Sequence, residues 1–281
     1  MVNNYQNSKF LSHRLRGFSE YENSSSALHN ACKSNIPYLE VDTRTNKEGE
    51  IYIYHNSSTT KEVDSNVCFS QEYSEKTKGL KYRNGENILS LKKALKIFRN
   101  RVHKDQKLCI DIKDYGFEEN HFSLVKEYDL EESVIFISWI PQVLISLYEM
   151  GTKSPLVLSH FNLIKYGIAG NIFVKVFKNL KLKLNKYVLL GEKKDSDSLE
   201  NMSHGFQHAI LYYKIPQYMK ELLIKTKGGI CVPKQLVNDT LMNYCNHNDI
   251  QLWIFSVNNF KDFSKYSQQN FIDVIFSNNV F

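Results

Sequence analysis

The sequence predicts one α/β domain built as a barrel of eight parallel strands that alternate with helices. Eight short apolar runs of strand length recur along the chain, with longer polar or helical stretches between most of them. Such alternation favours a parallel sheet. The chain has 281 residues, and a barrel of this kind takes about 250. No internal repeat or low-complexity linker divides the chain, so residues 1–281 are interpreted as a single (β/α)8 domain.

The elements can be placed in order along the chain. The eight barrel strands are predicted at 9–12, 37–42, 108–112, 134–138, 156–158, 229–232, 252–257 and 272–276. A ninth run at 51–54 follows a turn at 47–49 and is interpreted as a hairpin partner of the second strand. Helices are predicted at 24–32, 91–98, 142–150 and 237–245. Residues 56–87 and 159–207 are interpreted as insertions after the second and fifth strands.

Composition excludes several classes of protein. Hydrophobic residues make up 42% of the chain, which is too much for a disordered protein. No apolar run approaches the roughly 18 residues of a membrane span, and the polar N-terminus lacks the core of a secretory signal. The five cysteines are scattered, which argues against a disulfide scaffold or a zinc site. We therefore expect a cytoplasmic protein.

The net charge of +6 is modest and does not indicate a nucleic-acid partner. It is concentrated in residues 161–190, which hold six lysines and no acidic residue among large apolar side chains. The simpler interpretation is an amphipathic helix whose lysines face solvent. The alternative is a lid or a peripheral contact with an anionic membrane surface. The oligomeric state is left open.

Ionisable residues gather where the first strands end, which is where barrel enzymes carry their active sites. Glu40 and Asp42 are two residues apart on the second strand and therefore share one face, as do Asp111 and Lys113 on the third. Carboxylates that converge in a barrel repel each other unless a cation joins them. Oxygen ligands suit Mg²⁺ or Ca²⁺. Two histidines, an arginine and a lysine beside such a cation suit a phosphate ester.

The order of these motifs resembles the glycerophosphodiester phosphodiesterase family, which belongs to the superfamily of phospholipase C-like phosphodiesterases. That family opens with His-Arg-Gly, continues with Glu-Asn-Thr and Glu-x-Asp, and has a hairpin that ends in His-Asp. The corresponding stretches here are His13-Arg14, Glu22-Asn23-Ser24, Glu40-Val41-Asp42 and Tyr54-His55, followed by Asp111-Ile112-Lys113 for the family's Glu-x-Lys. The stretch from Asp273 to Asn278, which covers the end of the last predicted strand, resembles the family strand that ends near Thr-Asp.

The resemblance implies a metal-dependent phosphodiesterase that cleaves glycerophosphodiesters to glycerol 3-phosphate and an alcohol. It also implies a role for each matched residue. Carboxylates would hold one divalent cation, Mg²⁺ or Ca²⁺. Two basic groups would bind the phosphate oxygens, and two histidines would transfer the protons. These sets are Glu40, Asp42 and Asp111 for the metal, Arg14 and Lys113 for the phosphate, and His13 as base with His55 as acid, an order that the sequence does not fix. Glu22 and Asn23 are interpreted as a turn and helix start.

Departures from the family pattern leave alternatives open. Two extra residues precede Gly17, so Arg16 could replace Arg14 at the phosphate. Asn56 stands where the family has Asp, and Asp111 where it has Glu. One rival function is a phospholipase D-like or sphingomyelinase D-like enzyme acting on lysolipids, which an apolar, membrane-facing 161–190 would favour. The other is a degenerate barrel that binds a ligand without catalysis.

Overall fold

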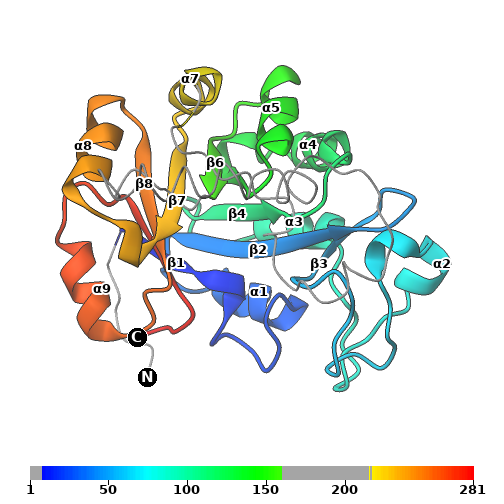
Figure 1. Cartoon of the computed structure of the whole chain (residues 1–281). Coiled ribbons are helices and arrows are strands. Elements are labelled where there is room, and N and C mark those ends of the chain that lie inside the picture. Colours follow the sequence, from blue (N-terminus) through cyan, green and yellow to red (C-terminus); the bar gives the residue numbers. More distant parts are fainter. Residues whose placement is uncertain (1–7, 160–214, 216) are drawn as a thin grey trace, which may run out of the picture.

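Eight apolar runs of the sequence form the parallel strands of a closed barrel (Figure 1). The structure is a computed structural model and describes residues 8–159, 215 and 217–281. The barrel strands, in chain order, are β1 (Phe10–Ser12), β2 (Tyr38–Thr45), β4 (Lys107–Ile112), β5 (Val134–Ser138), β6 (Leu156–Ser159), β7 (Gly229–Pro233), β8 (Gln251–Phe255) and β9 (Val274–Ser277). Each pairs in parallel with its neighbour in the chain, and pairing of β1 with both β2 and β9 closes the ring.

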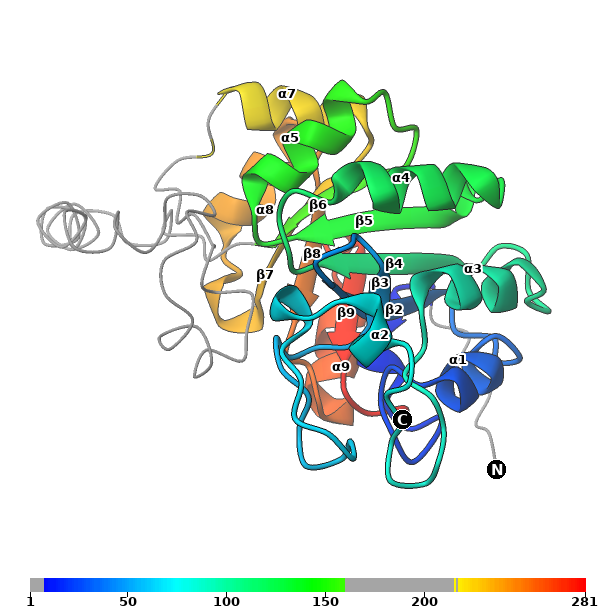
Figure 2. The ribbon, with the colours of Figure 1, turned by 90° about the vertical axis from the view of Figure 1, so that its right-hand side faces the viewer.

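Helices surround the barrel on the outside (Figure 2). They are α1 (Ser25–Ala31), α3 (Leu91–Arg99), α4 (Glu118–Glu127), α5 (Pro141–Glu149), α7 (Gln217–Lys225), α8 (Asp239–His247) and α9 (Phe260–Ser267), while the short helix α2 (Ser74–Thr77) lies in the segment 56–87 beyond the hairpin (Figure 1). Side chains cap several of them: the Ser24 hydroxyl accepts a bond from the backbone of α1, Ser90 from α3, Asn238 from α8 and Asn259 from α9. All four predicted helices are present, and α2, α4, α7 and α9 are additional to the prediction.

Two apolar layers result from the alternation of side chains along the strands. Leu39 and Val41 of β2 point outward into the core between barrel and helices. The inner layer fills the barrel and includes Cys109 of β4, Cys231 of β7 and Trp253 of β8, all fully or almost fully buried. Because successive residues of a strand face opposite sides, Glu40 and Asp42 point into the barrel, as the sequence predicted.

The hairpin strand β3 (Ile51–Ile53) pairs antiparallel with the end of β2, which lengthens β2 to Thr45. The Asn46 side chain accepts two backbone bonds inside the connecting turn, and Gly49 adopts a positive φ of 82° there. Residues 56–87, predicted as a polar insertion, form a folded lobe whose small core contains Phe69 and Tyr82 together with Tyr54 from the end of the hairpin. The lobe therefore follows directly after His55 at the barrel mouth.

Short 3₁₀ helices complete the described elements. They are η1 (His13–Leu15), η2 (Phe69–Gln71), η3 (Glu131–Ser133) and η7 (Lys234–Leu236). Of these, η1 matters for function, because it carries two predicted site residues directly after β1. None of the helices in the described ranges is long and apolar enough to cross a membrane.

Candidate active site

The seven predicted site residues meet at the C-terminal ends of the first barrel strands. The acids Glu40 and Asp42 lie on β2 and Asp111 on β4, while Lys113 follows β4 directly. The remaining three lie in loops at the same end: His13 and Arg14 in η1 after β1, and His55 two residues after β3. Active sites of such barrels form at this end, so the fold gives these side chains a common location.

Three buried carboxylates form the centre of the site. Asp42 and Asp111 are register partners on adjacent strands, and Glu40 lies one inward-facing position below Asp42. One oxygen from each carboxylate lies within 4.8 Å of the others. All three residues are at most 7% exposed. This is the acidic cluster that the alternation along β2 and β4 predicted.

The pKa values of all three carboxyl groups are shifted from their ordinary values. Burial, together with Asp42 and Asp111 nearby, raises the pKa of Glu40 well above its ordinary value. Burial likewise raises the pKa of Asp111. Burial opposes ionisation of Asp42 too, but Lys113, His55 and Arg14 together outweigh it and hold the Asp42 pKa well below its usual range. The positive side chains around this buried site therefore balance only part of the negative charge of the three carboxylates.

Lys113 is the nearest counter-charge. Its ammonium nitrogen lies 2.9 Å from Asp42 Oδ1 and donates a hydrogen bond to Asp111 Oδ2. The side chain is 5% exposed. Burial lowers the pKa of Lys113, but Asp111 and Asp42 more than reverse this, so the net shift is upward and the lysine stays charged. Lys113 is therefore paired with two carboxylates of the acidic cluster, Asp42 and Asp111.

Arg14 reaches the same carboxylates from the other side. Its backbone adopts a left-handed φ of 58° in η1, and its N–H donates to Glu40 Oε2 at 2.7 Å. Its guanidinium Nε lies 3.4 Å from Asp42 Oδ2, and a second nitrogen donates to Glu22. Arg16, the alternative for the phosphate, pairs with Glu22 and is more exposed. Arg14 therefore fits the predicted phosphate-binding position better than Arg16.

Each candidate catalytic histidine is held by an asparagine. His13 Nδ1 lies 2.6 Å from Asn278 Oδ1, and His55 Nδ1 lies 2.8 Å from Asn56 Oδ1. An amide oxygen only accepts, so in this arrangement Nδ1 carries the proton and Nε2 keeps its lone pair. Asn56 thus supports His55 from the position that holds Asp in the family pattern. His13 Nε2 lies 3.9 Å from Glu40, on the side of the acidic cluster.

Both imidazoles are neutral in this environment. Desolvation in the barrel mouth and the charge of Arg14 lower the pKa of His13 to about 3. Desolvation is also the largest cause at His55, where Lys113 and Arg14 help to lower the pKa to about 3. A neutral imidazole whose Nε2 is unprotonated is ready to accept a proton.

Asn23 belongs to the site, although its position at a helix start gave no reason to single it out. It is 1% exposed, adopts a positive φ of 56°, and its amide donates to Asp42 Oδ2 at 2.9 Å. Its amide oxygen in turn faces the Asp42 backbone N–H at 3.4 Å. Its neighbour Glu22 binds Arg14 and Arg16. The only available signal was its place in the Glu-Asn-Ser motif.

The residues fit a divalent cation. Asp111 Oδ1 is buried and accepts no hydrogen bond from any residue that the structure describes, and a buried carboxylate oxygen without a partner is costly. When all three carboxylates are ionised, as they are when they bind a cation, they and the two cations Arg14 and Lys113 leave one negative charge in the cluster. An ion of charge +2 would turn this into one positive charge, the complement of a phosphodiester anion. Hard oxygen ligands agree with Mg²⁺ or Ca²⁺.

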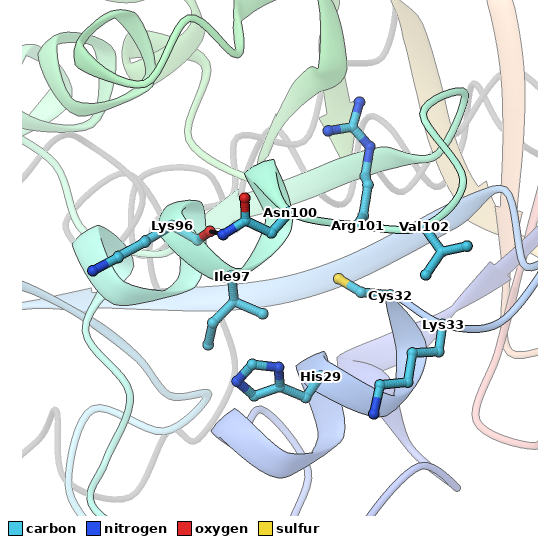
Figure 3. A pocket seen from close by; sticks show the side chains of 8 residues that line it. All are labelled: His29, Cys32, Lys33, Lys96, Ile97, Asn100, Arg101 and Val102. Atoms are coloured by element: carbon cyan, nitrogen blue, oxygen red, sulfur yellow. Dashed lines mark hydrogen bonds between the residues drawn. The ribbon is translucent and has the colours of Figure 1, made fainter.

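A separate pocket of about 340 Å³ opens between α1 and the end of α3 (Figure 3). It is lined by residues such as Cys32, Lys33, Ile97 and Arg101, and shares none with the predicted site. No acidic residue lines it. Burial raises the pKa of Cys32 to about 11, so its thiol is not an activated nucleophile. The chemistry of the molecule therefore points to the barrel mouth.

Two predictions concern residues outside those described. The lysine-rich segment 161–190 and most of the proposed insertion 159–207 lie there, so the predicted amphipathic helix, lid or membrane contact remains a prediction. The single-domain interpretation is likewise a prediction.

No protein-family model matches the chain, and no curated protein matches it in sequence. Solved structures do match in fold. A phosphodiesterase from Oleispira antarctica, solved in complex with the product sn-glycerol-3-phosphate, has 15% identity, covers 96% of this chain and 92% of its own, and gives a TM-score of 0.65. A glycerophosphodiester phosphodiesterase from Parabacteroides distasonis has 14% identity, coverages of 97% and 93%, and a TM-score of 0.65.

A third example is the glycerophosphodiester phosphodiesterase from Agrobacterium tumefaciens, with 14% identity, 97% coverage of both chains and a TM-score of 0.63. At such identities the likeness concerns the fold. This protein therefore has the barrel fold of the glycerophosphodiester phosphodiesterases of known structure, as the order of its motifs predicted.

Proposed function

We propose that the protein is a divalent-metal-dependent phosphodiesterase that hydrolyses glycerophosphodiesters to sn-glycerol 3-phosphate and an alcohol. The observation that carries the proposal is the convergence of Glu40, Asp42 and Asp111 in the mouth of a barrel, flanked by two histidines and two cations. The fold of the solved phosphodiesterases, one of them bound to sn-glycerol-3-phosphate, supports the same substrate class.

Each group has a chemical task in this proposal. The three carboxylates hold the cation, which when bound supplies positive charge for the phosphoryl oxygens. Arg14 and Lys113 orient the phosphate, because both lie beside the carboxylates that would hold the cation next to it. His13, kept as the Nδ1–H form by Asn278, takes a proton at Nε2 from the attacking hydroxyl, whether that of water or of the glycerol itself.

In this proposal His55, neutral in the substrate-free site, becomes protonated at Nε2 when the phosphodiester anion offsets the charges of Lys113 and Arg14, and it gives that proton to the departing alcohol. Its ring is fixed by Asn56 on one side, and its backbone carbonyl is held by Arg44. A choline or similar alkoxide is a poor leaving group, so a positioned acid is worth about 10²–10⁴-fold in rate. The assignment of His13 as base and His55 as acid is part of the proposal.

The test is hydrolysis of glycerophosphocholine, followed by choline release and by formation of sn-glycerol 3-phosphate. EDTA should abolish activity, and Mg²⁺ or Ca²⁺ should restore it. His13→Ala and Glu40→Gln should each lose at least about 100-fold. His29→Ala and Glu119→Gln, at exposed positions, serve as matched controls. Full activity of either site variant would refute the assignment.

The lysolipid alternative is tested in the same experiment. Lysophosphatidylcholine replaces glycerophosphocholine, and the products are examined for a cyclic phosphate. Cleavage of the lysolipid without cleavage of the glycerophosphodiester would replace the proposed substrate with the rival one. Binding of either substrate without turnover would favour the degenerate barrel.

A further inference from the structure

A buried arginine links three segments at the barrel mouth. Arg44 lies on β2, two residues beyond Asp42, and is 5% exposed. Its Nε donates to the backbone carbonyl of His55 at 3.0 Å, and its NH1 donates to Asp114 Oδ1 at 2.9 Å. The guanidinium thus spans the end of the hairpin and the residue that follows Lys113.

Asp114 completes the connection. Its other carboxylate oxygen accepts a hydrogen bond from the backbone N–H of Thr45 at 2.8 Å. One carboxylate therefore ties the loop after β4 to the end of β2, while Arg44 ties both to His55. The bonds are charge-assisted and geometrically restrictive because the guanidinium and carboxylate are planar. None of the four residues joined in this way is a proposed metal ligand.

The backbone of His55 is held by contacts that lie beyond the strand pairing of β3. The residue lies beyond the last ladder residue of β3, Ile53, so strand pairing alone does not fix its backbone. Two further contacts do so: the Tyr54 N–H donates to the Asp42 carbonyl at 3.0 Å, and Arg44 binds the carbonyl of His55 itself. Removing Arg44 takes away the side-chain hydrogen bond to the His55 carbonyl, which leads into the lobe 56–87.

We propose that Arg44, braced by Asp114, is a positioning residue that holds His55 in its working location at the barrel mouth. This inference depends on the proposed function, because His55 is there the proton donor to the leaving alcohol. Arg44 acts through a backbone carbonyl and does not touch substrate. A displacement of about 1 Å at a reacting group costs roughly 100-fold in rate, so a loss of 10- to 100-fold in kcat is expected without Arg44.

The activity test compares two esters of glycerol 3-phosphate. One is glycerophosphocholine, whose alcohol needs a proton on departure, and the other is the 4-nitrophenyl ester, whose phenolate leaves without one. Arg44→Met should lower kcat on the choline ester by about 10- to 100-fold, with KM within about twofold, and should change the nitrophenyl ester by less than about threefold. His55→Ala should show the same pattern across the two esters, and the double variant should be no slower than His55→Ala alone.

Matched variants separate positioning from general damage. Arg101→Met removes another buried arginine that binds backbone carbonyls, those of Phe98 and Lys104, and does not belong to the site. It should leave the ratio between the two esters unchanged. Asp114→Asn should show the same selective loss of kcat on the choline ester as Arg44→Met, but a smaller one. Equal losses of Arg44→Met on both esters, or a double variant with additive losses, would overturn the proposal.

A spectroscopic measurement tests the inference even if the wild-type protein cleaves neither ester, which would refute the proposed function. In ¹⁵N-labelled protein, ring signals of His13 and His55 can be assigned with His13→Gln and His55→Gln. Arg44→Met should shift or broaden the His55 ring signals and leave those of His13 in place. Unchanged His55 signals would overturn the positioning role independently of any activity.

Discussion

The bond between Asn23 and Asp42 allows a quantitative prediction, because its backbone and side-chain contributions can be separated. Asn23 has a left-handed φ of 56°, a region that asparagine and glycine tolerate better than other residues. Its amide donates to the buried Asp42 carboxylate at 2.9 Å. Asn23→Gly therefore removes the bond and keeps the backbone, whereas Asn23→Ala removes the bond and strains the backbone.

The expected magnitudes follow from these two effects. A hydrogen bond to a charged group contributes about 1.5–3 kcal/mol, so Asn23→Gly should lower the free energy of unfolding by about 2 kcal/mol. Left-handed alanine costs about 1 kcal/mol more, so Asn23→Ala should lose about 3 kcal/mol. Glycine also gives the unfolded chain more conformational freedom, worth about 0.4–1 kcal/mol, and a control has to account for that.

Urea denaturation in the presence of EDTA measures these differences without a bound cation. Asp249→Gly is the matched control, since Asp249 has a similar φ of 52° and is exposed. Its loss measures the effect of glycine on the unfolded chain. If Asn23→Gly loses no more free energy than Asp249→Gly, the bond to Asp42 contributes nothing and the reasoning fails. The loss of Asp249→Gly is first subtracted from that of Asn23→Gly, and if Asn23→Ala then loses no more than this corrected value, the left-handed backbone carries no strain.

Three further predictions concern the cation, pH and packing. Mg²⁺ or Ca²⁺ at about 100 times Kd should stabilise the protein by about 2.7 kcal/mol in calorimetry. Asp111→Asn should lose most of this stabilisation, and an equal stabilisation of the variant and the wild type would contradict the proposed site. Burial lowers the pKa of His121 from 6.5 to about 4. Because the unfolded chain then binds a proton that the folded protein does not, the free energy of unfolding should fall by about 3 kcal/mol as the pH drops from 6.5 toward 4. Urea denaturation at several pH values should show a smaller fall for His121→Gln, and an unchanged fall would refute this. A Cβ on Gly228 would lie 1.9 Å from the Leu156 carbonyl oxygen, so Gly228→Ala should destabilise by about 3 kcal/mol or more in urea, whereas Gly79→Ala, which meets nothing within 4 Å, should stay near wild type.

Much of the barrel was predictable because its strands are local patterns. All eight predicted strands and the hairpin strand are present, with ends shifted by a few residues. The largest shift is at β2, which continues to Thr45 because β3 pairs with it there. Helices α2, α4, α7 and α9 were missed. For α9, the Asn259 cap that starts the helix was not used as a signal, and its apolar contact with the core is limited to few residues, Phe263 among them.

The candidate site divides in the same way. Glu40, Asp42 and Asp111 could be grouped in advance because alternation along a strand fixes which face a side chain takes, and parallel strands end at a common edge. The partners of these residues could not. Asn278 supports His13 from 265 positions away, and Asn23 turns toward Asp42 only because a left-handed backbone directs it there.

The sequence by itself thus determined the elements, the inward face of each strand and the residue types available for a cation and a phosphate. The reason is that strand alternation and motif order are properties of neighbouring residues. Only the tertiary structure decided how these groups are oriented: Lys113 between two aspartates, an asparagine on each imidazole, and Arg44 joining His55 to Asp114. Those contacts exist because pairing of β1 with β2 and β9 closes the barrel and brings distant segments to one mouth.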